Sequence, residues 1–308
     1  MTRIGIIGTG WVGSSVAIST LHAGITQELL LSDVRTAIAE GEAMDLAHGA
    51  TFYPAASVRA ASLDQMRDTD AVVIAAGRGG RPNESRLDLA RDNAQVVRDI
   101  AAHLRGYAGI VIVVTNPVDV LTYEVAVAAG LPHERVIGTG TMLDTARLRE
   151  VIGRTLQLAP QSIHAQVVGE HGDSEVVLWS GARAAGLPLS HWPGWTSVLQ
   201  AEIADRVRRA AYEIIQRKGA TNHAIGLVTA ALLRALLRGE RRVLTVSRVQ
   251  DGAFGLHEVA LSLPTVVSAE GATHVIEPEL SVAEHEALKR SADVLRQGIQ
   301  SIGGGATR

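Results

Sequence analysis

The chain has 308 residues, a net charge of −3 and a hydrophobic fraction of 46%, enough for a sizeable core in one large domain or two ordinary ones. The slightly acidic balance argues against nucleic acid as the main partner, and the lack of cysteine excludes disulfides, thiolate metal ligands and a cysteine nucleophile. No apolar run approaches the roughly 18 residues of a membrane span, and the N-terminus lacks a signal-peptide pattern. We therefore expect a soluble, cytoplasmic protein.

The first half of the chain alternates short apolar runs with helical segments. The runs are continuous rather than alternating, which is typical of strands buried on both faces of a parallel sheet. Parallel strands joined by helices make right-handed crossovers, so the predicted architecture is a doubly wound α/β sheet. The expected strands are residues 3–8, 28–33, 71–77, 110–116 and 135–140, and the expected helices are residues 12–23, 36–49, 85–105 and 118–130.

From about residue 141 the order of the elements changes. Strand-like runs are now separated by pairs of long helices or follow one another directly, which is typical of an α+β domain. The predicted division is therefore residues 1–140 and 141–308. The expected helices in the second part are residues 142–156, 197–218, 221–238 and 281–300, and the expected strands are residues 163–168, 243–249 and 258–267.

A glycine-rich turn, GTGWVG at residues 8–13, follows the first expected strand and opens the first helix. In such a turn Gly8 permits the tight bend, Gly10 admits a pyrophosphate and Gly13 allows close helix–strand packing. The helix N-terminus offers its N–H groups to the phosphates. Asp33 ends the second strand 20 positions after Gly13, where a carboxylate binds the ribose hydroxyls of NAD and repels the 2′-phosphate of NADP. The sequence therefore predicts NAD as the cofactor.

Polar side chains at other expected strand ends and loops suggest a chemical site. Taken singly, each has an ordinary interpretation: His171 in VVGEHGDSE as a structural histidine, Asp144 and Arg147 in LDTAR as a surface ion pair, and Arg86 as a solvated arginine. Together they suit hydride transfer to a carbonyl, which needs a proton donor, a polarising group and a fixed substrate. His171 would carry the proton and Asp144 would fix its tautomer. Arg147 would bind a substrate carboxylate, and Arg86, on a closing loop, would polarise the carbonyl.

A series of motifs resembles the bacterial L-lactate dehydrogenases of the lactate/malate dehydrogenase superfamily over nearly the whole chain. In order, the motifs are GTGWVGS, ESRLDL, TNPVDVLT, GTMLDTARLR, VVGEHGDSEVVLWS, KGAT and LTVS. The resemblance implies a Rossmann domain followed by an α+β substrate domain, usually assembled as a homotetramer. It gives His171, Asp144, Arg147 and Arg86 the same roles as those argued above.

The resemblance also assigns binding residues. Asn116 would lie beside the nicotinamide ribose and the substrate carbonyl, although an Asn before Pro117 is first of all an ordinary helix N-cap. Thr221 would line the substrate pocket. The aromatic residues that commonly follow this threonine are absent, and His223 faces either the pocket or the solvent. No metal site is expected. The residues expected to contact NAD are Gly8, Gly10, Val12, Gly13, Asp33, Gly77, Thr115, Asn116 and Thr139.

The position that chooses the substrate in this superfamily falls on Gly80. Lactate dehydrogenases are similar to one another in having glutamine there, and malate dehydrogenases have arginine. Without a cation at Gly80 a second substrate carboxylate lacks a partner, which disfavours oxaloacetate unless a loop shift brings Arg81 into the pocket. The missing side chain also leaves volume, so we expect 2-oxo acids bulkier than pyruvate to be accepted alongside it.

Two further positions match the fructose 1,6-bisphosphate site that many bacterial lactate dehydrogenases carry between subunits. Arg149 and His164 are both basic, so an allosteric polyanion site is expected there, with two ordinary surface cations as the alternative.

The predicted function is an NAD-dependent L-2-hydroxy acid dehydrogenase, most simply an L-lactate dehydrogenase acting on pyruvate and lactate. The L stereochemistry follows from the resemblance. The alternatives are a broader-specificity enzyme for bulkier 2-oxo acids, a malate dehydrogenase, and a non-enzymatic NAD-binding protein of the same fold.

Overall fold

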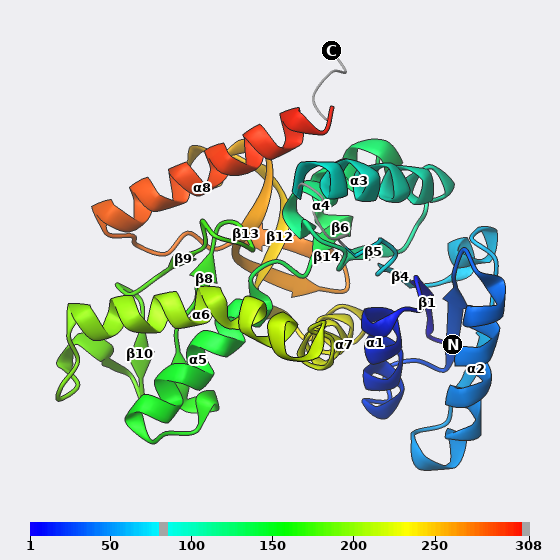
Figure 1. The fold of residues 1–308 in the computed structure, drawn as a ribbon, viewed down its shortest axis with the longest axis horizontal. Helices are drawn as coiled ribbons and strands as arrows, with labels where there is room; N and C mark the ends of the chain where they lie inside the picture. The colour runs from blue at the N-terminus through cyan, green and yellow to red at the C-terminus, as the bar shows by residue number, and fades with distance from the viewer. Residues whose placement is uncertain (80–85, 304–308) are drawn as a thin grey trace.

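The computed structural model describes residues 1–79 and 86–303, apart from the side chain of Arg86. Its main element is a nine-stranded sheet in the order β14-β13-β12-β6-β5-β4-β1-β2-β3 (Figure 1). The strands from β1 to β6 pair in parallel, and β12 to β14 pair antiparallel. The strands are β1 (Arg3–Ile7), β2 (Glu28–Ser32), β3 (Ser57–Ala60), β4 (Ala71–Ile74), β5 (Ile110–Val113), β6 (Val136–Gly138), β12 (Arg242–Asp251), β13 (His257–Ser268) and β14 (Gly271–Val275).

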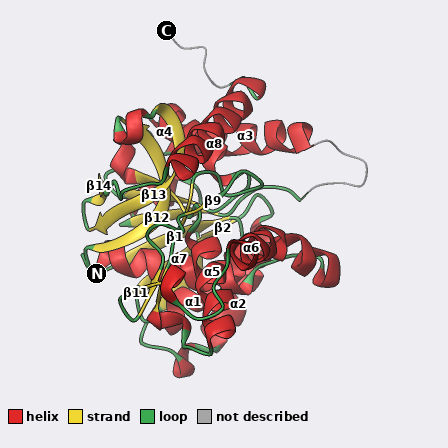
Figure 2. Ribbon diagram, turned by 90° about the vertical axis from the view of Figure 1, so that its left-hand side faces the viewer, coloured by secondary structure: helices red, strands yellow, loops and turns green. Residues whose placement is uncertain are grey.

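Helices cover both faces of this sheet, which confirms the predicted doubly wound α/β fold (Figure 2). Every residue of β2, β4 and β5 is buried, because these strands have apolar helices on both sides. One apolar layer lies under α3, α4 and α8, and the other lies under α1, α2 and α7. The helices are α1 (Trp11–His22), α2 (Thr36–His48), α3 (Arg86–His103), α4 (Val118–Ala129), α7 (His223–Leu237) and α8 (Val282–Ser301).

The C-terminal half contributes to this sheet as well as forming a smaller lobe. In the lobe a separate apolar cluster lies between α5 (Met142–Leu156), α6 (Ser197–Lys218) and short strands. The expected α+β character of residues 141–308 is therefore present. The predicted boundary at residue 140 stays a prediction, since the large sheet and both of its apolar layers run across it. The short strands are β7 (Ile163–His164), β8 (Val167–Val168), β9 (Val176–Val177), β10 (Arg183–Ala184) and β11 (Leu187–Pro188).

Two details differ from the sequence-based expectation. The run over residues 163–168 is not one strand: β7 pairs with β10, whereas β8 pairs with β9. The strands β3, β9, β10, β11 and β14 were not predicted. No helix among residues 1–79 and 86–303 is long and apolar enough to cross a membrane.

Candidate active site

The turn between β1 and α1 has the shape that a dinucleotide requires. Gly8 has a φ of +94°, and a Cβ added there would lie 2.5 Å from the Ala76 backbone. A Cβ added at Gly13 would lie 1.8 Å from the Gly8 carbonyl oxygen. Gly10, in contrast, has no atom within 4 Å of its Cβ position, so a phosphate can approach the backbone. No side chain caps the N-terminus of α1, which leaves its N–H groups available to an anion.

A cavity of about 960 Å³ opens beside this turn, within the size range of cofactor sites. It is lined by Gly8, Gly10, Asp33 and Gly77 among the predicted cofactor residues, but not by Val12, Gly13, Thr115, Asn116 or Thr139.

Asp33 presents a fixed carboxylate to this cavity. Its Oδ2 accepts hydrogen bonds from the N–H of Thr9 at 3.0 Å and the hydroxyl of Thr9 at 3.2 Å, and its Oδ1 accepts the N–H of Arg35 at 3.0 Å. Burial alone would raise the pKa of Asp33, but these hydrogen bonds outweigh it and the pKa is lowered. The carboxylate is therefore ionised and oriented, so the residues present fit the adenosine half of NAD.

The residues predicted for the nicotinamide end follow β5 and β6. Thr115 donates its hydroxyl at 2.7 Å to a carbonyl after β4. Asn116 accepts the N–H of Val118 through Oδ1 at 3.2 Å, so it does serve the first turn of α4, although Pro117 rather than Asn116 is the N-cap residue. Thr139 is buried directly after β6.

The second half of the chain brings both His171 and Arg147 into direct contact with Asp144. Asp144 and Arg147 lie in the first two turns of α5, three residues apart and therefore on one face. His171 lies on the loop between β8 and β9. Asp144 Oδ2 is 2.5 Å from His171 Nδ1, and Asp144 Oδ1 accepts a hydrogen bond from Arg147 Nη1 at 2.8 Å. This contact leaves Nε2 as the ring atom of His171 that can reach a substrate.

The environment of this cluster keeps the histidine protonated. Burial lowers the pKa of His171, but the charge of Asp144 and its hydrogen bond outweigh burial, and with the charge of Asp119 they raise the pKa to about 9. Burial also opposes ionisation of Asp144, yet the charges of His171 and Arg147 hold the pKa of Asp144 below its ordinary value. At neutral pH the cluster therefore holds an imidazolium, a guanidinium and one carboxylate.

The His171 loop is held against α8. The N–H of Glu170 donates to the hydroxyl of Ser291 at 2.8 Å, and Glu170 Oε2 accepts the N–H of Ser174 at 3.0 Å. The loop is thus tied on both sides of His171, and this limits the movement of the backbone that carries the ring.

Comparison with known proteins identifies the family. Residues 2–138 match the family model of the lactate/malate dehydrogenase NAD binding domain, and residues 141–303 match that of the lactate/malate dehydrogenase alpha/beta C-terminal domain. The chain belongs to the lactate/malate dehydrogenase family. The predictions of an NAD-dependent oxidoreductase and of a Rossmann domain followed by an α+β domain are confirmed by these two matches.

Individual members of the family are similar over nearly their whole length. The chain is 44% identical over 300 residues to an L-lactate dehydrogenase of a Synechococcus species, covering 96% of this chain and 98% of the relative. It is 43% identical over 302 residues to an L-lactate dehydrogenase of Bacillus caldolyticus, covering 96% and 95%. The crystal structure of minor L-lactate dehydrogenase from Enterococcus mundtii in the ligands-bound form superposes with a TM-score of 0.95 at 36% identity, covering 97% and 98%.

Other residues predicted for this dehydrogenase are only partly described. Arg86 is the first residue of α3, and its side chain lies outside the described part of the chain, as do Gly80 and Arg81. Thr221 is half-buried in the turn between α6 and α7. The next residue, Asn222, donates to the hydroxyl of Ser15 on α1 at 2.9 Å, which ties this turn to the dinucleotide half.

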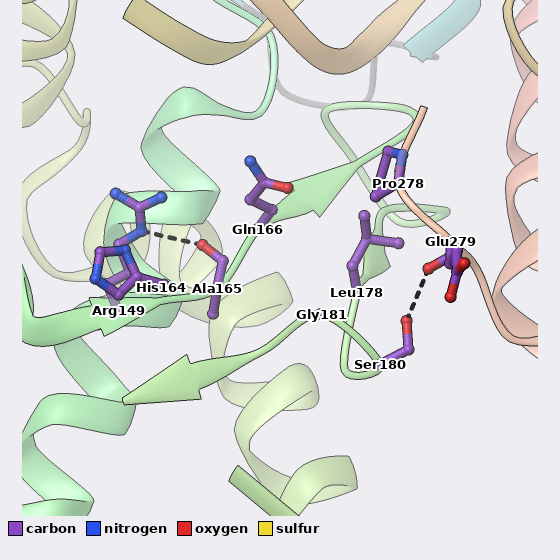
Figure 3. A pocket seen from close by; sticks show the side chains of 9 residues that line it. All are labelled: Arg149, His164, Ala165, Gln166, Leu178, Ser180, Gly181, Pro278 and Glu279. Carbon is purple, nitrogen blue, oxygen red and sulfur yellow. Dashed lines mark hydrogen bonds between the residues drawn. The ribbon is translucent and has the colours of Figure 1, made fainter. Parts of the chain in front are cut away.

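The two residues predicted for polyanion binding line one cavity of about 250 Å³. Figure 3 shows Arg149 and His164 at one end of it and Ser180 and Glu279 at the other. Arg149 donates through Nε to the carbonyl of Ala165 at 3.0 Å. Burial, with the nearby charge of Arg242, lowers the pKa of Arg149. The end lined by the Arg149 guanidinium and the His164 imidazole suits an anion better than the end lined by the Glu279 carboxylate.

Sequence reasoning missed three residues that bear on the dehydrogenase site. Thr9 holds the Asp33 carboxylate, Asp119 accepts the main-chain N–H of His171, and Glu175 is buried near Asp144 and Arg208. Thr9 lies within GTGWVG, Asp119 within TNPVD and Glu175 within VVGEHGDSE. The residue types were visible there, but the direction of each side chain was not.

Proposed function

We propose that this dehydrogenase is an NAD-dependent L-lactate dehydrogenase, which interconverts pyruvate and lactate. The observation that carries the proposal is the contact of one aspartate with both a histidine and an arginine: Asp144 binds His171 Nδ1 and Arg147 Nη1. A 2-oxo acid needs one proton donor for its carbonyl and one cation for its carboxylate, and the cluster offers both a short distance apart.

The cofactor, when bound, supplies or accepts the hydride at the carbonyl carbon. His171 donates the proton from Nε2 to the carbonyl oxygen during reduction and takes it back during oxidation. Asp144 keeps the proton-carrying tautomer in place and stabilises the imidazolium. Arg147 uses one donor on Asp144, and its remaining N–H groups bind the substrate carboxylate. Arg86, at the start of α3, is proposed to polarise the carbonyl oxygen.

The substrate range is proposed from Gly80. No side chain at this position offers a cation for a second carboxylate, so oxaloacetate is expected to be a poor substrate and the malate alternative is not favoured. The same absence leaves room for 2-oxo acids larger than pyruvate. We therefore propose pyruvate as the basic substrate, with bulkier apolar 2-oxo acids accepted beside it.

The test is the oxidation of NADH by the purified chain, followed by absorbance, with pyruvate, 2-oxoisocaproate, phenylpyruvate and oxaloacetate. Turnover of pyruvate with little turnover of oxaloacetate supports the proposal. His171→Asn should lower kcat by at least ~10³-fold because the proton donor is lost. His133→Asn, an exposed histidine in the dinucleotide half, is the matched control and should leave kcat unchanged. The absence of turnover with all four acids would contradict the proposal.

A regulatory anion is proposed for the cavity at Arg149 and His164. A guanidinium and an imidazole at one end of a cavity suit a phosphorylated sugar such as fructose 1,6-bisphosphate. Addition of this compound should lower the KM for pyruvate, and Arg149→Gln should remove the effect. A titration that changes neither kcat nor KM of the unmodified chain would contradict this part of the proposal.

A homotetramer in the cytoplasm is also proposed. Support comes from large apolar side chains exposed on neighbouring helices, Trp11 and Ile18 on α1 and Leu227 on α7, of which Trp11 is 62% and Leu227 66% exposed. The helices α1 and α7 pack together (Figure 1), so these side chains suit burial by a second copy. Sedimentation equilibrium of the unmodified chain and of Leu227→Glu tests this, and a monomeric unmodified chain would contradict it.

A further inference from the structure

Asp119 is a buried carboxylate that the reaction described above does not use. It is the last residue of the TNPVD motif and lies in the first turn of α4. Only 2% of the residue is exposed. Its Oδ2 accepts a hydrogen bond of 2.7 Å from the main-chain N–H of His171. A residue on the helix that follows Asn116 is thus in direct contact with the loop that carries the proton donor.

The carboxylate is charged at neutral pH in spite of its burial. Burial raises the pKa of Asp119 to about 6, and the Ser247 hydroxyl and the N–H of His171 limit the rise. The N-terminus of α4 further favours a negative charge at this point. Oδ1 has no well-formed hydrogen bond among the described residues. The negative charge of Asp119 is therefore not fully compensated by hydrogen bonds, and it stabilises the nearby protonated ring of His171.

Two negatively charged side chains near His171 stabilise its protonated ring. Asp144 on α5 contacts the ring, and Asp119 on α4 contacts the main chain; both favour the imidazolium, whereas Arg147 opposes it. Glu175, at the end of the same loop, also faces His171, and Glu170 faces Asp119. Asp119 differs from the other acids in being bonded to the backbone of the histidine itself.

We propose that Asp119 is a positioning residue of the active site, which anchors the main chain of His171 and holds the negative charge that helps to keep its ring protonated. This inference rests on the proposed function for its catalytic meaning. It connects the nicotinamide end of the site to the proton donor. Asn116 and Asp119 belong to the same TNPVD motif, and Asp119 binds the backbone of His171. Asp144 fixes the ring of His171, and Asp119 fixes the backbone that carries the ring.

The first test measures the protonation of His171 directly, without cofactor or substrate. Histidine labelled with carbon-13 is titrated by NMR, and the His171 signal is assigned by its loss in His171→Asn. In Asp119→Asn the amide oxygen still accepts the N–H but the charge is gone, so the pKa of His171 should fall by about 1 unit. Asp173→Asn removes an exposed carboxylate from the same loop and should leave the pKa within about 0.2 units.

The second test separates positioning from charge. For pyruvate reduction, Asp119→Asn should keep kcat at low pH and move the alkaline limb of kcat/KM down by the same ~1 unit. Asp119→Ala also loses the acceptor, so kcat should fall ~10- to 100-fold at every pH. A merely structural role would lower the unfolding temperature without moving the limb or the NMR titration.

These outcomes are distinct from failure of the proposed function. If the chain reduces no 2-oxo acid, the NMR titration still decides whether Asp119 acts on His171. If Asp119→Asn does not fold, the unmodified chain is used: its His171 signal should show a second, smaller inflection near the pKa of Asp119, about 6. An unshifted pKa of His171 in Asp119→Asn, or no second inflection in the unmodified chain, overturns the inference.

Discussion

Ser247 on β12 pairs with Gly138 on β6, and this pairing joins the antiparallel C-terminal strands to the parallel sheet. The two strands and α4 approach so closely here that no side chain fits at residue 138. A Cβ added to Gly138 would lie 2.4 Å from the hydroxyl of Thr122 on α4 and 3.0 Å from the Cβ of Ser247. Ser247 also lies beside Asp119, and Asp119 accepts the main-chain N–H of His171, so this junction is packed directly against the residues that hold the His171 loop.

Gly138→Ala is therefore expected to destabilise the fold. The added methyl group must displace α4 or β12, and overpacking of this kind costs about 1–3 kcal/mol in the free energy of unfolding. The midpoint of urea unfolding measures the change. Gly41→Ala is the control: residue 41 lies in α2 with no atom within 4 Å of its Cβ position, so this change should stabilise by about 0.5–1 kcal/mol. Equal midpoints for Gly138→Ala and the unmodified chain would contradict the argument.

The fully buried strands of the sheet were predicted from the sequence, whereas the partly exposed edge strand β3 was missed. β2, β4 and β5 are buried along their whole length, so their sequences are continuous apolar runs with a clear signal. β3 is an edge strand whose residues alternate between exposed and half-buried, and its sequence, SVRA, has no such run. The run over residues 163–168 is interrupted at residues 165–166, where the chain leaves one sheet for another, and apolar character alone does not mark that change.

The candidate active site was also only partly predictable from the sequence. His171, Asp144 and Arg147 were predicted because their residue types suit one reaction. Asp119 and Glu175 were not predicted, since an acid within a motif has many ordinary roles and only the packing of α4 and the β8–β9 loop directs it toward the histidine. Arg86 and Gly80 stay predictions, since the Arg86 side chain and residue 80 lie outside the described part of the chain.

Asp144→Asn should shift the pH dependence of the reaction. The charge of Asp144 is the larger of the two attractions that raise the pKa of His171 to about 9, so its loss should lower that pKa by about 2 units. Pyruvate reduction needs the protonated ring, so the pH at which kcat/KM declines on the alkaline side should fall by the same amount. Lactate oxidation needs the neutral ring, and its acid limb moves down as well.

The measurement is kcat/KM in both directions from about pH 6 to about pH 10. Glu150→Gln removes a charge from the same helix, where Glu150 pairs with Arg154 instead, and should leave both limbs in place. Unchanged limbs in Asp144→Asn would mean that Asp144 does not set the protonation of His171.

Asp33→Asn should weaken NADH binding and reduce the discrimination against NADPH. The ionised carboxylate is held by Thr9 and Arg35, and a hydrogen bond to a charged group contributes about 1.5–3 kcal/mol. The Kd for NADH should therefore rise at least ~10-fold, whereas the Kd for NADPH should rise less because a repulsive charge is removed. Cofactor fluorescence in the absence of substrate gives both constants. Asp45→Asn, on the exposed side of α2, is the control, and an equal rise for both cofactors would count against the role of Asp33.

Glu175 is buried beside the cluster of His171, Asp144 and Arg147, with 6% of the residue exposed and no hydrogen-bond partner for Oε1 among the described residues. Burial and the charge of Asp144 raise the pKa of Glu175 to about 8, against an ordinary value of 4.5, although Arg208 opposes the rise. Between these two pH values the folded chain keeps a proton that the unfolded chain has lost. The contribution of Glu175 to stability is therefore complete below pH 4.5 and is lost as the pH rises to about 8.

Glu175→Gln removes this pH dependence, because glutamine has nearly the same shape and cannot ionise. Relative to the unmodified chain, the variant should gain roughly 1–3 kcal/mol of unfolding free energy between about pH 5 and about pH 8. Urea unfolding at the two pH values measures the gain. Glu202→Gln, on the exposed face of α6, loses the same charge without burial and should show no gain. If the two variants depend on pH in the same way, Glu175 is ionised in the folded chain at neutral pH, and Arg208 rather than burial controls its charge.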